Sequence, residues 1–205
     1  KVVQQFLSLL QPHGLPDDTM APSFGMSETS SGIVFNKLLN RLSPTSGYQI
    51  LDKASLGGTV RSVPVDHPNH VMFTEVGGPI PGVSIRIVDS NNNVIRENQI
   101  GRLQVKGNNI MVGYYQNPEA NAEVFVEDGW FITGDLGFLH QGRLTITGRE
   151  KDVIIINGNN IHNYEIESFV EEVKGVKVTF SAAVSIPKVS SGSDELAIFF
   201  VPEDH

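Results

Sequence analysis

Three charged side chains stand in short glycine-containing segments that are typical of turns, where a ligand can reach them. Glu28 follows a Gly-Met-Ser stretch, Asp135 follows Thr-Gly, and Arg149 follows a glycine. A Glu carboxylate is a hard oxygen ligand that suits a Mg²⁺ ion bridging phosphates. An Asp carboxylate can accept hydrogen bonds from two neighbouring hydroxyls, and a forked guanidinium suits ribose and phosphate oxygens. These residue types could contact the phosphates and the ribose of a nucleotide.

Two neighbours of Glu28 add candidates, and several candidates also have a purely structural interpretation. Phe24 stands beside Gly25, so its ring could stack on a purine, or it could be a core aromatic at a strand end. Ser27 offers a hydroxyl to a phosphate oxygen. Glu28 could instead be a solvated turn residue, and Arg149 could pair with a neighbouring acidic side chain on the surface.

The usual catalytic motifs are missing from the sequence. There is neither a Walker-type phosphate loop nor a G-x-G-x-x-G dinucleotide motif. Ser27 lies in Gly-Met-Ser-Glu-Thr, which lacks the last glycine of a nucleophile elbow. With no cysteine and no H-x-x-x-H pair among six histidines, we expect neither a thiol nucleophile nor a zinc site.

Composition and charge exclude several classes of protein. The 205 residues are 40% hydrophobic and 19% charged, which is typical of a globular protein. A formal net charge of −8 is a poor match for nucleic acid or anionic lipid, so neither is an expected partner. No apolar stretch reaches membrane-spanning length, and neither a leader nor a glycosylation sequon occurs, so we expect a cytoplasmic protein without a membrane span.

The elements that must position these residues are mixed α and β. Apolar spacing predicts helices over residues 3–10 and 166–173, and an Asn-Pro cap predicts another over 118–124. Alternation and short apolar runs predict strands over 83–87, 103–105, 153–156, 178–186 and 196–201, with a hairpin across Gln141-Gly142. Residues 36–74 are polar and weakly periodic, and Gly77–Gly82 is interpreted as a sharp loop.

A domain boundary is expected near Gly148-Arg149-Glu150-Lys151-Asp152. This charged stretch joins the predicted hairpin to a new strand–helix–strand unit. The expected domains are therefore 1–148 and 149–205, although a charged stretch is also typical of an ordinary surface turn.

Four segments in this order resemble the superfamily of adenylate-forming enzymes, which includes acyl-CoA ligases, luciferase-like enzymes and peptide-synthetase adenylation domains. The segments are Phe24–Glu28, Gly77–Gly82, Trp130–Asp135 and Gly148–Asp152, and the resemblance covers about residues 20 to 205. It implies that residues 1–148 are the C-terminal portion of the large adenylation core, including a β-rich subdomain. It also implies that residues 149–205 are the hinge and the start of the small α+β C-terminal domain.

The resemblance also implies ligands and residue roles. A carboxylic acid would be activated by ATP and Mg²⁺, and its acyl group passed to a phosphopantetheine thiol of a carrier protein or to CoA. Glu28 would bind the metal, and Lys151 would stand at the hinge. Besides Glu28 and Lys151 as catalytic residues, the implied nucleotide-binding set is Phe24, Gly25, Met26, Ser27, Asp135 and Arg149.

Two features favour one branch of the superfamily. The long segment 29–76 and the block 151–160 are most similar to fatty acyl-AMP ligases and synthase loading domains, which use a carrier protein. An acyl-CoA ligase, an amino-acid adenylation domain and a non-catalytic scaffold remain alternatives. The family's phosphate loop and catalytic lysine would lie before Lys1 and after His205, so we expect a piece of a longer enzyme that is inactive alone.

Overall fold

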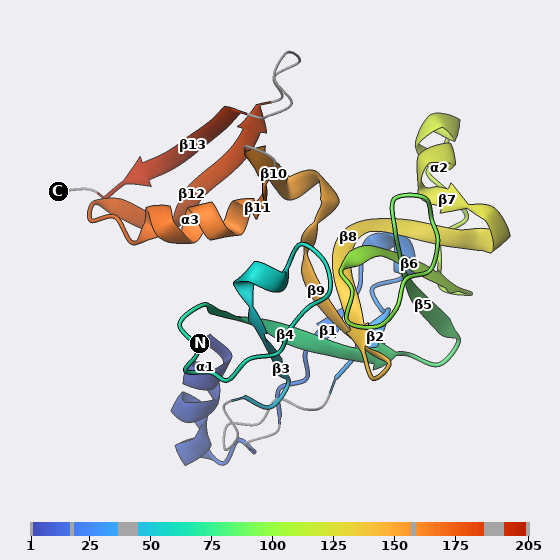
Figure 1. Ribbon diagram of the computed structural model, residues 1–205. Helices are drawn as coiled ribbons and strands as arrows, with labels where there is room; N and C mark the ends of the chain where they lie inside the picture. The colour runs from blue at the N-terminus through green and yellow to red at the C-terminus, as the bar shows by residue number, and fades with distance from the viewer. Residues whose placement is uncertain (1, 17–18, 37–44, 157–158, 187–194, 204–205) are drawn as a thin grey trace. The chain divides into compact units, whose positions relative to one another are not determined.

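The computed structural model describes residues 2–16, 19–36, 45–156, 159–186 and 195–203. Within that part of the chain there are two compact units, Lys1–Thr147 and Gly148–His205. Each unit combines helices and strands, which confirms the mixed α/β fold class (Figure 1). Among the described helices, none has the length and apolar character needed to cross a membrane.

The first unit is built on an antiparallel sheet, which has nine strands among the described residues. The main path runs β1-β2-β4-β9-β8-β6-β5, while β3 pairs with β4 and β7 pairs with β8. Two helices belong to this unit, α1 (Val2–Leu10) and α2 (Pro118–Val124). The strands are β1 (Ser23–Phe24), β2 (Val34–Phe35), β3 (Tyr48–Asp52), β4 (His70–Pro79), β5 (Val83–Val88), β6 (Gly101–Gly107), β7 (Phe125–Val126), β8 (Trp130–His140) and β9 (Arg143–Arg149).

The core of this unit lies along the central strands. Leu103 and Val105 alternate along β6 and are fully buried, as are Phe131 of β8 and Leu144 of β9. Phe125 of β7 meets Phe131 edge-on, with ring centroids 5.4 Å apart. Burying each such side chain is worth about 1.5–3 kcal/mol, so this cluster anchors the strands that carry the candidate site.

The hairpin between β8 and β9 confirms the turn predicted at Gln141-Gly142. Both residues have positive φ, 52° and 72°, which matches the twist of the flanking strands. The Glu97 carboxylate accepts the backbone N–H groups of Gln141 and Gly142, each at 2.9 Å. These bonds lower the pKa of Glu97, so the carboxylate stabilises the turn in its charged form.

The loop predicted at Gly77–Gly82 was wrong for its first three residues. β4 continues to Pro79, and Phe35 of β2 pairs with Gly78. Gly77 has a φ of +95°, and a Cβ there would lie 2.0 Å from the Phe35 carbonyl oxygen. Glycine therefore marks a close approach of two strands at this position rather than a turn.

The second unit is smaller. It contains β10 (Val153–Ile156), β11 (Asn159–His162), α3 (Asn163–Glu171), β12 (Val176–Ile186) and β13 (Glu195–Pro202). Helix α3 lies along β12, as Figure 1 shows. Glu167 of α3 accepts the Ala183 N–H at 3.0 Å, and Glu171 accepts the Thr179 N–H at 2.8 Å. These bonds fix the helix on the ribbon formed by β12 and β13.

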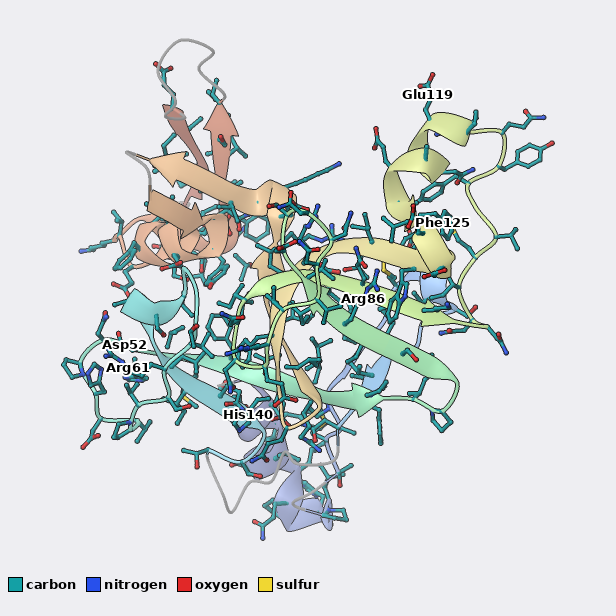
Figure 2. All side chains as sticks on the ribbon, turned by 45° about the vertical axis from the view of Figure 1, so that its right-hand side comes forward. Asp52, Arg61, Arg86, Glu119, Phe125 and His140 are labelled. Carbon is teal, nitrogen blue, oxygen red and sulfur yellow. The ribbon has the colours of Figure 1, made fainter. Side chains whose placement is uncertain are left out.

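The last residue of β3 is a buried carboxylate. Asp52 is 3% exposed and accepts hydrogen bonds from Arg61, the Ala54 N–H and Asn69. Figure 2 shows Asp52 and Arg61 beside one another. The Arg61 bond, followed by the Ala54 bond, lowers the pKa of Asp52 to about 2.

The Asp52 contribution to stability is expected to depend on acid pH. Because the folded-state pKa is depressed, this contribution is present above about pH 4 and is lost as the pH falls toward 2. Asp52→Asn should lower the urea midpoint at pH 7 and flatten its decline between pH 4 and 2. Asp66→Asn, an exposed change in the same loop, is the control. Parallel pH profiles for wild type and Asp52→Asn would contradict the assignment.

Candidate functional site

The first candidate segment is a tight turn that begins at β1. Gly25 approaches the backbone so closely that a Cβ would lie 2.2 Å from the Ser31 carbonyl oxygen. Phe24 and Met26 flank it and pack, partly buried, against the core cluster that includes Phe131. Gly25 is therefore fixed by backbone packing, and the Phe24 ring contacts the core while remaining partly exposed.

A buried threonine holds the next turn of the chain, the 3₁₀ segment Ser27–Thr29. The Thr29 hydroxyl donates to the Met26 carbonyl at 3.0 Å and accepts the Met26 N–H at 3.2 Å. Thr29 is fully buried, whereas Ser27 is exposed and Glu28 is partly exposed. The turn thus presents a hydroxyl and a carboxylate at its surface.

Residues 109–111, about 80 positions further along the chain, donate hydrogen bonds to the backbone in and just after this turn. Asn109 donates to the carbonyls of Thr29, at 2.9 Å, and Gly32, at 2.7 Å. The Met111 N–H donates to the Glu28 carbonyl at 2.8 Å. The backbone around Glu28 is therefore fixed by long-range bonds as well as by its own turn.

The Glu28 side chain has one partner in the described part of the chain. The Tyr114 hydroxyl donates to Glu28 Oε1 at 3.0 Å, whereas Oε2 has no hydrogen-bond partner among the described residues. Burial, followed by this bond, raises the pKa of Tyr114. The phenol therefore stays protonated and donating at neutral pH. Sequence reasoning assigned Tyr114 no role, because nothing local predicts a contact over 86 positions.

Asp135 stands in a bulge of β8. Arg102 pairs with Leu136 and Gln104 with Ile132, so the three residues 133–135 face Leu103 alone. Gly134 supplies the irregular backbone with a φ of +79°. Bulges often re-aim a side chain beside a functional site.

The Thr133 hydroxyl fixes the shape of this bulge. It donates to the Leu103 carbonyl at 3.2 Å and accepts the Asp135 N–H at 3.0 Å. Both backbone groups are thereby paired where the regular ladder is interrupted. Asp135 is 4% exposed, so its carboxylate is buried.

The other candidates fall in the second unit. Arg149 ends β9, and Lys151 lies in the short 3₁₀ turn Glu150–Asp152. Both side chains are exposed. The structure thus places Phe24, Glu28 and Asp135 in the first unit, with Phe24 packed on its core, and the two cations just after the start of the second unit.

The donor set around Glu28 fits Mg²⁺. No group of three or more potential metal-ligating side chains occurs among the residues that the structure describes. Mg²⁺ commonly uses one or two carboxylates together with substrate phosphates and water, rather than an all-protein cage. One carboxylate with an available oxygen, beside the exposed Ser27 hydroxyl, matches that pattern.

Thr133→Val should destabilise the first unit, since the variant leaves the Leu103 carbonyl and the Asp135 N–H without their shared partner. The expected loss is about 1–3 kcal/mol in the free energy of unfolding, measured in urea. Thr145→Val is the matched control, because Thr145 is fully buried on β9 and its hydroxyl has no hydrogen-bond partner among the described residues. Equal losses in the two variants would mean that the bulge does not depend on Thr133.

Several known proteins are similar to this chain in sequence and in fold. The chain is 32% identical over 203 residues to the nonribosomal peptide synthetase apvA of Aspergillus terreus, covering 98% of this chain and 20% of that protein. A multidomain structure of a keto acid-selecting NRPS module, with adenylation, ketoreductase and pseudo-Asub domains, is 53% identical with a TM-score of 0.85. That match covers 98% of this chain and 17% of the module.

Two further solved structures share the fold. The McyG A-PCP structure complexed with phenylalanyl-adenylate is 42% identical with a TM-score of 0.74, over 98% of this chain and 32% of that one. A structure from work on fatty acyl-adenylate ligases of E. coli and L. pneumophila has a TM-score of 0.79 at 24% identity, over 98% and 35% of the two chains, and shows the fold alone.

The curated relative is much longer than this chain, which spans about a fifth of its length. A family match extends over residues 2–115, more than half of the 205 residues, and includes the turn of Glu28 and its partner Tyr114. This chain belongs to the family of AMP-binding enzymes.

Proposed function

We propose that this chain is part of an NRPS-type adenylation domain. The complete domain would activate a carboxylic acid with ATP and pass the acyl group to the phosphopantetheine thiol of a carrier protein. The observation that carries the proposal is the Glu28 turn, where an available carboxylate oxygen and an exposed hydroxyl stand on a backbone fixed from two sides.

Similarity supports the peptide-synthetase branch over the fatty acyl-AMP ligase branch that the sequence favoured. Identity is 53% to a keto acid-selecting NRPS module but 24% to the fatty acyl-adenylate ligase structure. The long segment 29–76 contains β3 and most of β4, so part of its length is regular sheet. Residues 157–158 of the block 151–160 lie outside the described residues. A role in lipid metabolism is therefore less supported than one in peptide or keto-acid assembly.

In the proposed first reaction, a carboxylate oxygen of the acid bonds to the α-phosphorus of ATP. The bond between that phosphorus and the bridging oxygen breaks, so acyl-adenylate and pyrophosphate result. Bound Mg²⁺ would neutralise phosphate charge as it develops. Glu28 would hold the metal, and the Ser27 hydroxyl would donate to a phosphate oxygen.

Other residues of the chain would orient the nucleotide. Asp135, fixed by the Thr133 bulge, would accept hydrogen bonds from the ribose hydroxyls, and Phe24 would lie against adenine. Arg149 would bind ribose or phosphate oxygens. Such catalysis rests on positioning and on charge neutralisation, so it needs no nucleophile from this chain.

In the proposed second reaction, the pantetheine sulfur attacks the acyl carbon. AMP leaves with the electron pair of the acyl–oxygen bond, and the thiol proton is lost to solvent or base. The short turn Glu150–Asp152 follows the last strand of the sheet at the boundary between units, and we assign Lys151 to the hinge there.

Glu28→Gln in the full-length protein should slow acid-dependent ATP–pyrophosphate exchange by about a hundredfold, because one charged ligand at the phosphates is lost. Asp135→Asn should instead raise the KM for ATP. Glu119→Gln is the control, since Glu119 projects from the exposed side of α2 (Figure 2). Wild-type exchange in both site variants would overturn the catalytic assignment and favour a scaffold role.

Lys151→Pro should separate the two reactions. Proline restricts φ at the proposed hinge, so thioester formation on the carrier should slow far more than pyrophosphate exchange. Lys151→Ala removes the same charge without restricting the backbone and serves as the matched control. If the proline and alanine variants load the carrier at the same rate, the hinge does not act at this position.

A further inference from the structure

We propose that Tyr114 is a positioning residue for Glu28, and that Asn121 of α2 holds Tyr114 in place. This inference rests on the proposed function, because it concerns the carboxylate that would bind the metal. It assigns a role to two residues that would not contact the nucleotide. Through Glu28 they would strengthen the binding of ATP in the presence of Mg²⁺.

The first step is the orientation of the carboxylate. The Tyr114 hydroxyl engages Oε1 at 3.0 Å and leaves Oε2 available, so the bond selects which oxygen faces a ligand. A Glu side chain on an exposed turn otherwise samples many rotamers, and ordering it costs conformational entropy. The tyrosine bond provides that order before a ligand arrives, which strengthens binding.

The second step is the position of Tyr114 itself. The Tyr114 N–H donates to Asn121 Oδ1 at 2.6 Å, and Asn121 Nδ2 donates to the Tyr114 carbonyl at 3.0 Å. One amide side chain thus pairs with both backbone groups of the tyrosine. Gly113 has a φ of +143°, and a Cβ there would lie 3.0 Å from the Asn121 amide. A larger residue at 113 would therefore push this amide away.

The third step is the attachment of α2. The helix has seven residues, too few to be stable alone in water. Asn117 caps its start by accepting the Ala120 N–H at 3.1 Å, and Phe125 follows its end and packs on Phe131 in the core. The contacts therefore run without interruption from the core through α2 and Asn121 to Tyr114.

The adjacent tyrosine supplies a natural comparison. Tyr115 is 89% exposed, and its hydroxyl accepts a bond from its neighbour Gln116. Two phenols, next to each other in sequence, thus differ in whether they contact Glu28. Of the two, the Tyr114 side chain is the one that connects α2 to the turn.

Tyr114→Phe tests the proposal in the full-length protein by calorimetric titration of ATP with and without Mg²⁺. A hydrogen bond to a charged group is worth enough for about a tenfold change, so ATP affinity should fall about tenfold with Mg²⁺ and stay unchanged without it. Asn121→Ala should act in the same direction. Tyr115→Phe should leave both affinities at the wild-type value.

Three outcomes would overturn the proposal. The first is a Tyr114→Phe variant whose ATP affinity equals the wild-type value both with and without Mg²⁺. The second is a Tyr114→Phe variant that loses the same factor of ATP affinity with and without Mg²⁺, as a merely structural role predicts. Wild-type Mg²⁺ dependence in Glu28→Gln would instead overturn the proposed function itself, and the positioning role with it. Should Asn121→Ala fail to fold, Asn121→Asp, which keeps the acceptor and removes the donor, replaces it.

Discussion

The candidate site depends on the hydrogen bonds that join the Ser27–Thr29 turn to residues 109–114. Asn109 pairs with the carbonyls of Thr29 and nearby Gly32, Met111 pairs with the Glu28 backbone, and Tyr114 pairs with the Glu28 side chain. These partners lie roughly 80 positions away in sequence, so tertiary packing supports the turn beyond its own local bonds. The position of the Glu28 carboxylate therefore depends on the tertiary fold, and the turn sequence alone does not determine it.

The two candidate carboxylates are held by the same kind of device. Beside Glu28, the hydroxyl of Thr29 donates to and accepts from the Met26 backbone. Beside Asp135, the hydroxyl of Thr133 donates to the neighbouring strand β6 and accepts the Asp135 N–H of its own strand. Both threonines are buried. In each case a threonine hydroxyl pairs with backbone groups that the irregular backbone would leave unpaired. These bonds stabilise the segment that carries the candidate carboxylate.

Local patterns were sufficient for much of the fold, whereas the roles of the site residues on short motifs stay predictions. The Asn-Pro cap predicted α2, and Gln141-Gly142 predicted the β8–β9 hairpin, because each carries its own turn chemistry. β3 was missed because its residues lack clear alternation, and the end of β4 was missed because Gly77 has a steric role between strands. No role was predicted for Tyr114 or Asn121, since their contacts arise from tertiary packing.

The most direct test is a crystal structure of the full-length protein with a non-hydrolysable ATP analogue and Mn²⁺ in place of Mg²⁺. We expect an anomalous peak within metal-ligand distance of Glu28 Oε2, with the Tyr114 hydroxyl still bonded to Oε1 and the ribose at Asp135. A Mn²⁺ peak bound by other carboxylates, with Glu28 facing away from the nucleotide, would contradict the role assigned to Glu28.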